Sequence, residues 1–581
     1  MLIDGARYRW SIEAADPDLV SAIQRSAGLT AATAEALVRR GVGSADEAQR
    51  LLSPDIRDLP DVQLLPDVDK MVARVRRALE VGERITVHGH DDADGVTASI
   101  VMVDALRELG GEVGVYIPDR RTEGHGLNTV ELDGLAASGT TLLITVDSCV
   151  SEVENIAYAA SLGIDVIVTD HHEIPPVLPA AVAIINAKLP DSPYPYRYMA
   201  GAGLAWRLAG HLLEEFADKR TAAPPWGGER WMDEALPLAA IGSIADRVPL
   251  TGDNRVLITE GLRVLPQTVR PGLRALLEAS NLSGRALSYD DVQENIGSIF
   301  GRVSDGKGTN RAYEMLAEED PEAAASIARE LADARQEWRS TANRAWKIVE
   351  RVASELPADS PVLIVEAAVP IEVMGSATSR LAEKTGKPCL LIMKKNGEAH
   401  AEARGPAGYN FVVAFQSMGE LFLGYGGHPR AAGFSIESDR VDEFRARMEA
   451  HAAEHPPVPV PRVVDAELPL SDATLTTAVE LAGFAPFGQG WGRPVLLARG
   501  VTREAVAAVE QNGLRFRTPM RVADGPVDLF YRLSVADEVL FASEVDRAPG
   551  DAGAAAGAGS SADAADGGLT DTAADTASWE A

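Results

Sequence analysis

Residues 84–99 read RITVHGHDDADGVTAS, a short apolar run that leads into a cluster of histidines and aspartates. The apolar run predicts a buried β-strand. The amphipathic stretch TASIVMVDALRELG, which begins at Thr97 after the cluster, predicts a helix. The same alternation continues over the next hundred residues, where the apolar runs are EVGVYIP, TLLITVD, IDVIVTD and AVAIINA. Strands that alternate with helices in this way predict a mostly parallel sheet.

Three of these predicted strands end in residues that bind metal ions. Val87 leads into HGHDDADG, Val146 into Asp147, and Val168 into TDHHE. Because ligands gather beyond the carboxyl ends of the strands in an open parallel sheet, we expect the three clusters to meet in one crevice. We expect Asp246, which closes the apolar segment LAAIGSIAD, to reach the same place.

The residue types in this crevice indicate its chemistry. Carboxylate oxygens and imidazole nitrogens suit Mn²⁺ or Mg²⁺ rather than a thiolate-bound metal. Several carboxylates in one crevice repel one another unless cations lie between them, which favours two ions. Two cations roughly 3.5–4 Å apart can activate a water and stabilise the leaving oxygen of a phosphoryl displacement. The implied reaction is hydrolysis of a phosphodiester or phosphoanhydride.

The string HGHDDADG taken alone also fits a solvated loop, or a helix N-terminus with capping aspartates. The coincidence of three strand ends favours the metal site over that interpretation. The residues leave open how His88 and His90 divide their roles, because residues two apart share one face of an extended strand. One of them can bind a metal while the other supports it.

Composition sets the class of protein. The 581 residues carry 86 Asp and Glu against 55 Lys and Arg, a net charge of −31, and 46% of them are hydrophobic, which is typical of a globular chain of three or four domains. Two cysteines, Cys149 and Cys389, exclude a disulfide framework and a cysteine-built zinc site. Without a long apolar run or a signal peptide, we expect a soluble cytoplasmic protein with no membrane contact. The acidic balance disfavours a basic nucleic-acid coat protein, but a local basic groove remains compatible with it.

Changes in composition along the chain predict its organisation. Helical signals dominate the start, a long polar helix is predicted over 321–356, HPPVPVPRV marks a boundary, and the end is acidic and poor in bulky apolar residues. The expected parts are a helical lead-in (1–70), the parallel-sheet domain (71–265), a helical connector (266–357), a second α/β domain (358–455), a β-rich domain compatible with a small barrel (460–548) and a disordered acidic tail (549–581).

Six strings in order resemble the DHH phosphoesterase family, and within it the bacterial exonucleases specific for single-stranded DNA. They are HGHDDADGVTAS, YIPDRRTEGHGLN, LLITVDS, VIVTDHHEIPP, AGAGLAWRLAG and GSIADRVPLTGDNR. Further on, VMGSATSRLAEKTGKP and YGGHPRAAGF look like the DHH-associated domain, and LAGFAPFGQGWGRP resembles the start of an OB-fold domain. The resemblance covers about residues 5–545. It implies a multidomain α/β protein with a parallel-sheet DHH phosphoesterase core, a DHH-associated α/β domain, a long helical connector and an OB-like β-barrel domain.

Position by position, the resemblance implies roles for individual residues. It places the first metal on His88, Asp92 and Asp147, and the second on Asp94, Asp147, His171 and Asp246. His90, although it replaces the family's aspartate, is still a residue type that can bind a metal ion. Asp147 would bridge the ions, and His172 would face the scissile phosphate as its electrostatic or acid partner. The residues implied to grip the DNA backbone or a terminal phosphate are Arg120, Arg302, Arg380, Arg404 and His428.

The function implied is that of an exonuclease that uses two divalent cations, Mn²⁺ or Mg²⁺, to hydrolyse single-stranded DNA. We expect 5′ to 3′ degradation to mononucleotides in DNA repair and recombination, by a monomer that works with single-strand-binding protein and a helicase. An OB-like domain would extend the strand path, with aromatic candidates Phe487, Trp491, Phe516 and Tyr531, although core packing is favoured for most of them. The alternatives are a phosphodiesterase for short oligonucleotides, cyclic dinucleotides or pyrophosphate, and a catalytically silent scaffold. All the ligand residues are present, which ranks the scaffold last.

The chain departs from the family pattern at several positions. His90 stands in place of an aspartate, Cys149 in place of a glycine or another small residue, and Pro370 in place of a histidine. Ser304 and Lys307 replace an asparagine and an arginine, and Glu402 replaces a serine near Arg404, where a carboxylate repels phosphate. These departures predict altered DNA grip, end recognition or processivity with an intact metal centre. For the acidic tail, a solubilising extension is favoured over a partner-binding segment or a DNA mimic.

Overall fold

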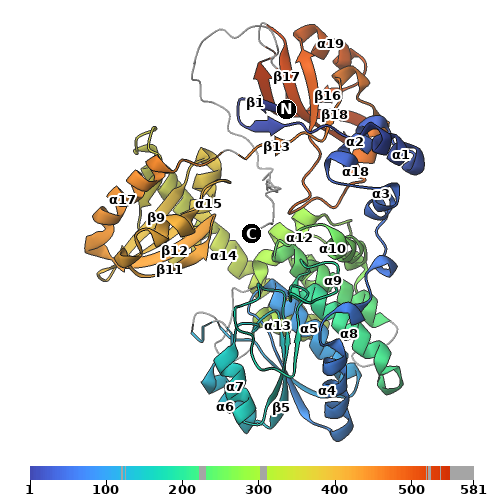
Figure 1. Ribbon diagram of the computed structural model, residues 1–581, viewed down its shortest axis with the longest axis vertical. Helices are drawn as coiled ribbons and strands as arrows, with labels where there is room; N and C mark the ends of the chain where they lie inside the picture. Colours follow the sequence, from blue (N-terminus) through green and yellow to red (C-terminus); the bar gives the residue numbers. More distant parts are fainter. Residues whose placement is uncertain are drawn as a thin grey trace. The chain divides into compact units, whose positions relative to one another are not determined.

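The computed structural model describes residues 1–119, 122–124, 126–221, 230–300, 310–458, 460–518, 520, 522, 525–536 and 538–549 (Figure 1). They form two compact units. Among the described residues, unit 1 joins Met1–Ser11 to Asp333–Val463, and unit 2 joins Ile12–Ala332 to residues 464–549. Five sequence expectations lie outside the described residues: those for Arg120, Arg302, Ser304, Lys307 and the acidic tail from residue 550.

The predicted parallel sheet lies in unit 2. Its five strands all run parallel in the order β4-β3-β5-β6-β7. Their bounds are β3 (Arg84–His88), β4 (Glu112–Tyr116), β5 (Thr140–Val146), β6 (Asp165–Thr169) and β7 (Ala183–Ile185). Each strand coincides with one of the apolar runs, so the sheet expected from the alternating pattern is confirmed.

Helices cover both faces of this sheet, with α4, α5 and α8 on one side and α6 and α7 on the other (Figure 1). Strand alternation explains the two layers: Leu142 and Ile144 of β5 pack into the core on the α5 side, whereas Leu143 packs into a separate core with Ile156 of α7. The helix bounds are α4 (Val68–Val81), α5 (Ala93–Glu108), α6 (Thr129–Ala137), α7 (Val153–Ser161) and α8 (Gly201–Glu215).

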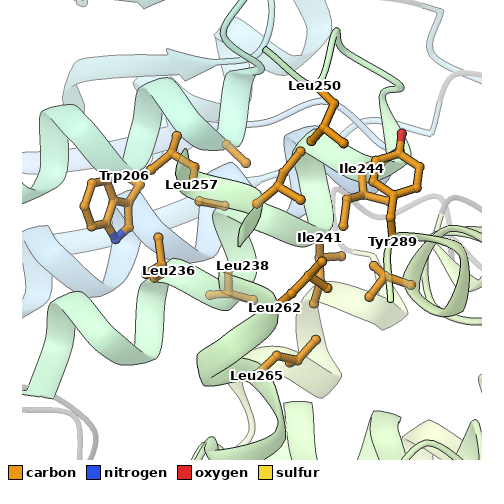
Figure 2. Close-up of a cluster of buried hydrophobic side chains, with 14 of the residues drawn as sticks. Trp206, Leu236, Leu238, Ile241, Ile244, Leu250, Leu257, Leu262, Leu265 and Tyr289 are labelled. Carbon is orange, nitrogen blue, oxygen red and sulfur yellow. The ribbon is translucent and has the colours of Figure 1, made fainter. Parts of the chain in front are cut away.

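Helix α9 (Trp231–Ala245) is apolar on all sides and is therefore buried among its neighbours. Figure 2 shows Ile241 and Ile244 of α9 packed with Leu257 and Leu262 of α10 (Gly252–Val264) and with Tyr289. The expected helical connector follows as α11 (Pro271–Ala279), α12 (Tyr289–Asn295), α13 (Arg311–Ala317) and α14 (Pro321–Ser354). The division between the units falls within α14, the long helix that the sequence predicts.

The OB-like part of unit 2 is a five-stranded sheet in the order β14-β15-β17-β18-β16. Its elements are β14 (Ala466–Glu467), α18 (Leu475–Ala482), β15 (Leu496–Val501), α19 (Arg503–Gln511), β16 (Arg515–Phe516), β17 (Val527–Ala536) and β18 (Val539–Pro549). Trp491 and Tyr531 are buried, so core packing is confirmed for these two aromatic candidates, while Phe487 and Phe516 are half-buried.

A buried arginine joins the OB-like part to the rest of unit 2. Arg255 of α10 donates hydrogen bonds to the carbonyls of Phe484, Ala485 and Pro486 at 2.8–3.3 Å. Its guanidinium carbon also lies 5.2 Å from the ring centre of Trp491. The string LAGFAPFGQGWGRP is therefore a docking segment within unit 2.

Unit 1 holds the DHH-associated part, a five-stranded sheet in the order β11-β12-β10-β9-β8 in which only β8 and β9 pair in parallel. Its elements are β8 (Leu363–Glu366), α15 (Ile371–Thr385), β9 (Cys389–Lys395), β10 (Glu398–Arg404), α16 (Phe411–Gln416), β11 (Phe422–His428), β12 (Ala431–Glu437) and α17 (Val441–Glu454). A phenylalanine cluster that includes Phe415, Phe434 and Phe444 fills its core.

The start of the chain differs from the expected helical lead-in. β1 (Leu2–Asp4) and β2 (Arg9–Ser11) form a hairpin that pairs with β13 (Arg462–Val463) in unit 1. The turn closes through a hydrogen bond from Gly5 N to Tyr8 O, a local pairing too short for a periodicity signal. Helices do follow, as α1 (Pro17–Ala27), α2 (Ala31–Arg39) and α3 (Ala45–Leu52). No helix in the described part of the chain combines the length and apolarity that a membrane crossing requires.

Candidate metal centre

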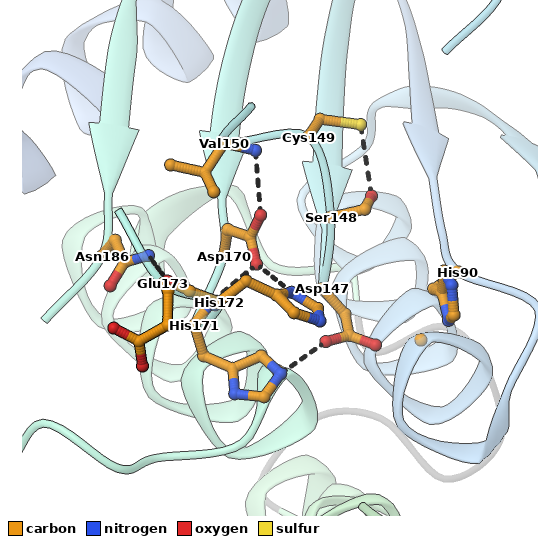
Figure 3. A network of polar contacts seen from close by, with 12 residues as sticks. His90, Asp147, Ser148, Cys149, Val150, Asp170, His171, His172, Glu173 and Asn186 are labelled. Carbon is orange, nitrogen blue, oxygen red and sulfur yellow. Dashed lines mark hydrogen bonds and ion pairs between the residues drawn. The ribbon is translucent and has the colours of Figure 1, made fainter. Parts of the chain in front are cut away.

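The carboxyl ends of β3, β5 and β6 bring the candidate ligands to one edge of the parallel sheet. Asp147 directly follows β5, and His171 and His172 lie just past β6. Asp92 is the N-cap of α5 and accepts a hydrogen bond from Gly95 N at 3.1 Å, while Asp246 caps the C-terminus of α9. Figure 3 shows His90, Asp147, His171 and His172 converging at this edge. The meeting of the three strand-end clusters therefore follows the sequence expectation.

Among the residues that the structure describes, three groups of side chains offer ligand atoms within 4.8 Å of one another. They are His90, Asp92 and Asp147; Asp147, His171 and His172; and Asp94, His171 and Asp246. His171 Nε2 lies 2.9 Å from Asp147 Oδ1 and 3.8 Å from both Asp94 Oδ2 and Asp246 Oδ2. Asp147 belongs to two groups, as a bridging carboxylate would. The assignment of each ligand to an ion remains a prediction.

His88 belongs to none of these groups. It lies on the same face of β3 as Thr86, opposite the face of Ile85 and Val87, and its Nε2 is 3.3 Å from Glu131 Oε1 of α6. Burial opposes protonation of His88, but Glu131 and Cys149 beside it raise its pKa well above the ordinary value. The structure thus brings His90, rather than His88, to the carboxylates of Asp92 and Asp147.

Asp170 is a buried residue that the sequence analysis did not single out. Its Oδ1 accepts hydrogen bonds from the backbone N–H groups of His171 and His172 at 2.7 and 3.0 Å, and lies 2.7 Å from His172 Nδ1. Val150 N donates to its other oxygen at 2.9 Å (Figure 3). Burial raises the pKa of Asp170, but the contact with His172 outweighs it and holds that pKa below the ordinary value. The sequence feature that could have identified Asp170 is its position directly before the two histidines.

Two glycines let backbone approach the carboxylates closely. A Cβ atom on Gly201 would come within 2.5 Å of Asp147 Cβ, and one on Gly242 within 2.5 Å of Asp94 Oδ1. The N-terminus of α8 uses this space, because Gly201 N and Ala202 N donate hydrogen bonds to Asp94 at 2.7 and 2.8 Å. The strings AGAGLAW and AIGSIAD therefore supply the backbone that packs directly against the carboxylates of Asp147 and Asp94.

The backbone after β5 adopts an uncommon conformation. Asp147 has φ +60° and Cys149 φ +81°, both in the left-handed region that favours glycine. This conformation gives a physical reason for the glycine that the family pattern has in place of Cys149. The Cys149 side chain is buried in the core on the α7 side, as expected of a small hydrophobe.

The electrostatics of the three groups fit bound cations. Burial, reinforced by the neighbouring carboxylates, raises the pKa of Asp147 well above its ordinary value, that of Asp94 to about 7 and that of Asp246 to about 6. Asp147 Oδ1 is buried, and its 2.9 Å contact with His171 Nε2 is the polar contact recorded for it within the described residues. Oxygen and nitrogen donors crowded in this way suit divalent ions of the Mg²⁺ and Mn²⁺ type.

These pKa shifts predict how the metal-free protein responds to pH. In the unfolded chain the aspartates lose their protons near pH 4, whereas in the folded protein Asp94 and Asp246 keep theirs to about pH 7 and 6. Between those limits the folded state binds more protons, so its stability falls as pH rises. We expect the melting temperature of the chelator-treated protein to decrease from pH 5 to pH 7.5, and Mn²⁺ to restore it at pH 7.5. A melting temperature that rises over this range without metal would contradict the crowding of the carboxylates.

The remaining predicted DNA contacts lie in unit 1. Arg380 of α15 donates a hydrogen bond to Asn343 Oδ1 at 3.0 Å and stacks on Trp346. Arg404, at the end of β10, forms an ion pair with Glu402 at 2.7 Å. Glu402, which stands where the family pattern has a serine, therefore offsets the positive charge of Arg404. His428, the last residue of β11, is exposed.

Comparison with known protein families accounts for three parts of the chain. Residues 84–227 match the DHH family N-terminal domain, 359–454 the DHHA1 domain and 464–530 the RecJ OB domain. Several relatives carry the name single-stranded-DNA-specific exonuclease RecJ. That of Bacillus subtilis is 30% identical over 90% of this chain, which spans 65% of that protein's length, and that of Dickeya dadantii is 33% identical over 79% of this chain and 82% of its own.

Solved structures agree with this result. RecJ from Thermus thermophilus in complex with Mn²⁺ superimposes with a TM-score of 0.75 at 26% identity, covering 94% of this chain and 80% of that one. The same protein in complex with Mg²⁺ gives a TM-score of 0.70. With matches to all three domain types and relatives at 30% identity or more over most of its length, the chain belongs to the RecJ family of DHH phosphoesterases.

Proposed function

We propose that this chain is a metal-dependent exonuclease that hydrolyses single-stranded DNA, from the 5′ end and with release of mononucleotides. The observation that carries the proposal is the convergence of His90, Asp92, Asp94, Asp147, His171 and Asp246 at the carboxyl edge of a parallel sheet. Membership of the RecJ family supports single-stranded DNA as the substrate. The cofactors are divalent cations, Mn²⁺ or Mg²⁺, which occur in the solved RecJ structures and match the donor set here.

The residues of the site have two kinds of role, metal binding and assistance to the reacting phosphate. The carboxylates, His90 and His171 would hold divalent cations, which when bound would supply an activated water and charge stabilisation at the scissile phosphate. Asp170 orients His172, and its hydrogen bond and negative charge raise the pKa of His172 above the ordinary value. The His172 side chain is 56% exposed, so its imidazole is accessible to a phosphate. A protonated imidazole there would offset the negative charge that develops on the phosphate oxygens or donate a proton to the leaving oxygen.

Cationic groups outside the metal centre would hold the DNA strand. Arg380, Arg404 and His428 of unit 1 remain our candidates for contacts with backbone or terminal phosphate, since guanidinium and imidazole groups donate to phosphate oxygens. Within the OB-like part, Phe487 and Phe516 are half-buried, unlike the buried Trp491 and Tyr531, and stay our candidates for base stacking, although the Arg493 guanidinium lies 5.0 Å from the Phe487 ring centre.

We place the activity in DNA repair and recombination in the cytoplasm. The proposed acting form is a monomer that cooperates with single-strand-binding protein and a helicase. Family membership alone supports these finer assignments.

The test is a time course with purified full-length protein and Mn²⁺ or Mg²⁺ on single-stranded DNA labelled at one end. Matched duplex DNA and a dinucleotide serve as alternative substrates, and a chelator-treated sample is the control. We expect mononucleotides from the 5′ end of the single strand alone. Release from the 3′ end would contradict the direction, and no cleavage of any substrate would overturn the enzymatic function.

One observation favours a second candidate, a phosphodiesterase for short substrates. Because Glu402 neutralises Arg404, one of the candidate grips for a longer strand is weakened. Cleavage of the dinucleotide without cleavage of the longer single strand would support that candidate.

A further inference from the structure

His90 lies in a closely packed setting at the edge of the sheet. It follows β3 by two residues and packs against the first turn of α5, where a Cβ atom on Gly95 would come within 2.4 Å of His90 Cβ. Its Nδ1 lies 2.9 Å from Asp92 Oδ2, and its side chain is 19% exposed. Packing thus fixes the imidazole beside the carboxylates of Asp92 and Asp147.

The group formed by His90, Asp92 and Asp147 offers one nitrogen and two carboxylate ligands. Mg²⁺ takes oxygen ligands in near-ideal octahedral geometry, whereas Mn²⁺, a transition-metal ion, accepts an imidazole nitrogen more readily than Mg²⁺ does. His88, the other imidazole of the string, turns to Glu131, so His90 supplies the nitrogen of this group. We propose that His90 is a specificity-determining residue that makes this group select Mn²⁺ over Mg²⁺. The inference rests on the proposed function, because it concerns the same metal centre.

Replacement of His90 tests the inference directly. His90→Asp would convert the group to three carboxylates, which suits Mg²⁺, and aspartate is the residue that the family pattern has at this position. We expect the ratio of Mn²⁺ to Mg²⁺ affinity to fall by about tenfold in this variant. His455→Asp is the matched control, because it makes the same chemical change at an exposed residue of unit 1, outside the metal groups.

The experiment measures binding rather than catalysis. Calorimetric titrations of the full chain with Mn²⁺ alone and Mg²⁺ alone give both affinities for the wild type, His90→Asp and His455→Asp. Pulsed electron paramagnetic resonance of bound Mn²⁺ detects coupling to imidazole nitrogen. In the wild type we expect Mn²⁺ to bind more tightly than Mg²⁺ and to couple to His90 as well as His171. The coupling from His90 should disappear in His90→Asp and persist in His455→Asp.

Two results would overturn the inference. One is an unchanged ratio of Mn²⁺ to Mg²⁺ affinity in His90→Asp. The other is a wild-type Mn²⁺ spectrum with coupling to no more than one imidazole, which can be judged even if the variant fails to fold. If the binding results are as expected but the wild type cleaves no single-stranded DNA, the proposed function fails and the selectivity of His90 still stands.

Discussion

Asp147→Asn is expected to lower the rate of single-stranded DNA hydrolysis by at least about a thousandfold while the protein stays folded. The residue belongs to two of the three ligand groups, so loss of its charge weakens both. A bound metal contributes several kcal/mol of transition-state stabilisation, and each 1.4 kcal/mol corresponds to about tenfold in rate. Asparagine retains the size of the side chain and tolerates the left-handed backbone at φ +60°.

The measurement is the initial rate of mononucleotide release at saturating Mn²⁺, with circular dichroism as the check on folding. Asp133→Asn provides the matched control, since Asp133 is an exposed aspartate on α6 in the same unit. Activity of Asp147→Asn within tenfold of the wild type would rule out Asp147 as a bridging ligand.

His172→Ala is expected to lower kcat by roughly 10²- to 10⁴-fold, the usual contribution of a positioned acid or base. Mn²⁺ affinity should change far less, because the proposed ligands His171, Asp94, Asp147 and Asp246 would still be present. Asp170→Asn should reduce kcat in the same direction but less, because it removes the charge that orients His172 and favours its protonation. Asp170 is therefore a positioning residue.

Single-turnover rates on a short single strand and calorimetric Mn²⁺ titrations separate catalysis from metal binding for these variants. A variant at an exposed histidine of unit 1 outside the three ligand groups, His455→Ala, should match the wild type in both. If His172→Ala loses Mn²⁺ affinity in proportion to its loss of rate, His172 is a ligand rather than the acid.

Much of this arrangement could be predicted from local sequence. The apolar runs that end at His88, Val146 and Thr169 identify the strands, and the rule for parallel sheets places the following acids and histidines at one edge. The role of the two nearby histidines could not be predicted in this way. The local pattern makes His88 and His90 equally good candidate ligands. The contact of His88 with Glu131 depends on helix α6, which packs over the face of β3 that carries His88.

Long-range contacts also explain what the pattern missed. The hairpin at Met1–Ser11 is stabilised by pairing with β13, a strand from a distant part of the chain, and Asp170 acquires its importance from backbone donors that only the folded loop brings together. The fold class and the set of candidate metal ligands can be proposed from the amino acids alone, because hydrophobic periodicity and residue chemistry are local properties. Which imidazole joins which carboxylates follows only from the folded chain, because that choice depends on the faces of strands and helices that meet far apart in sequence.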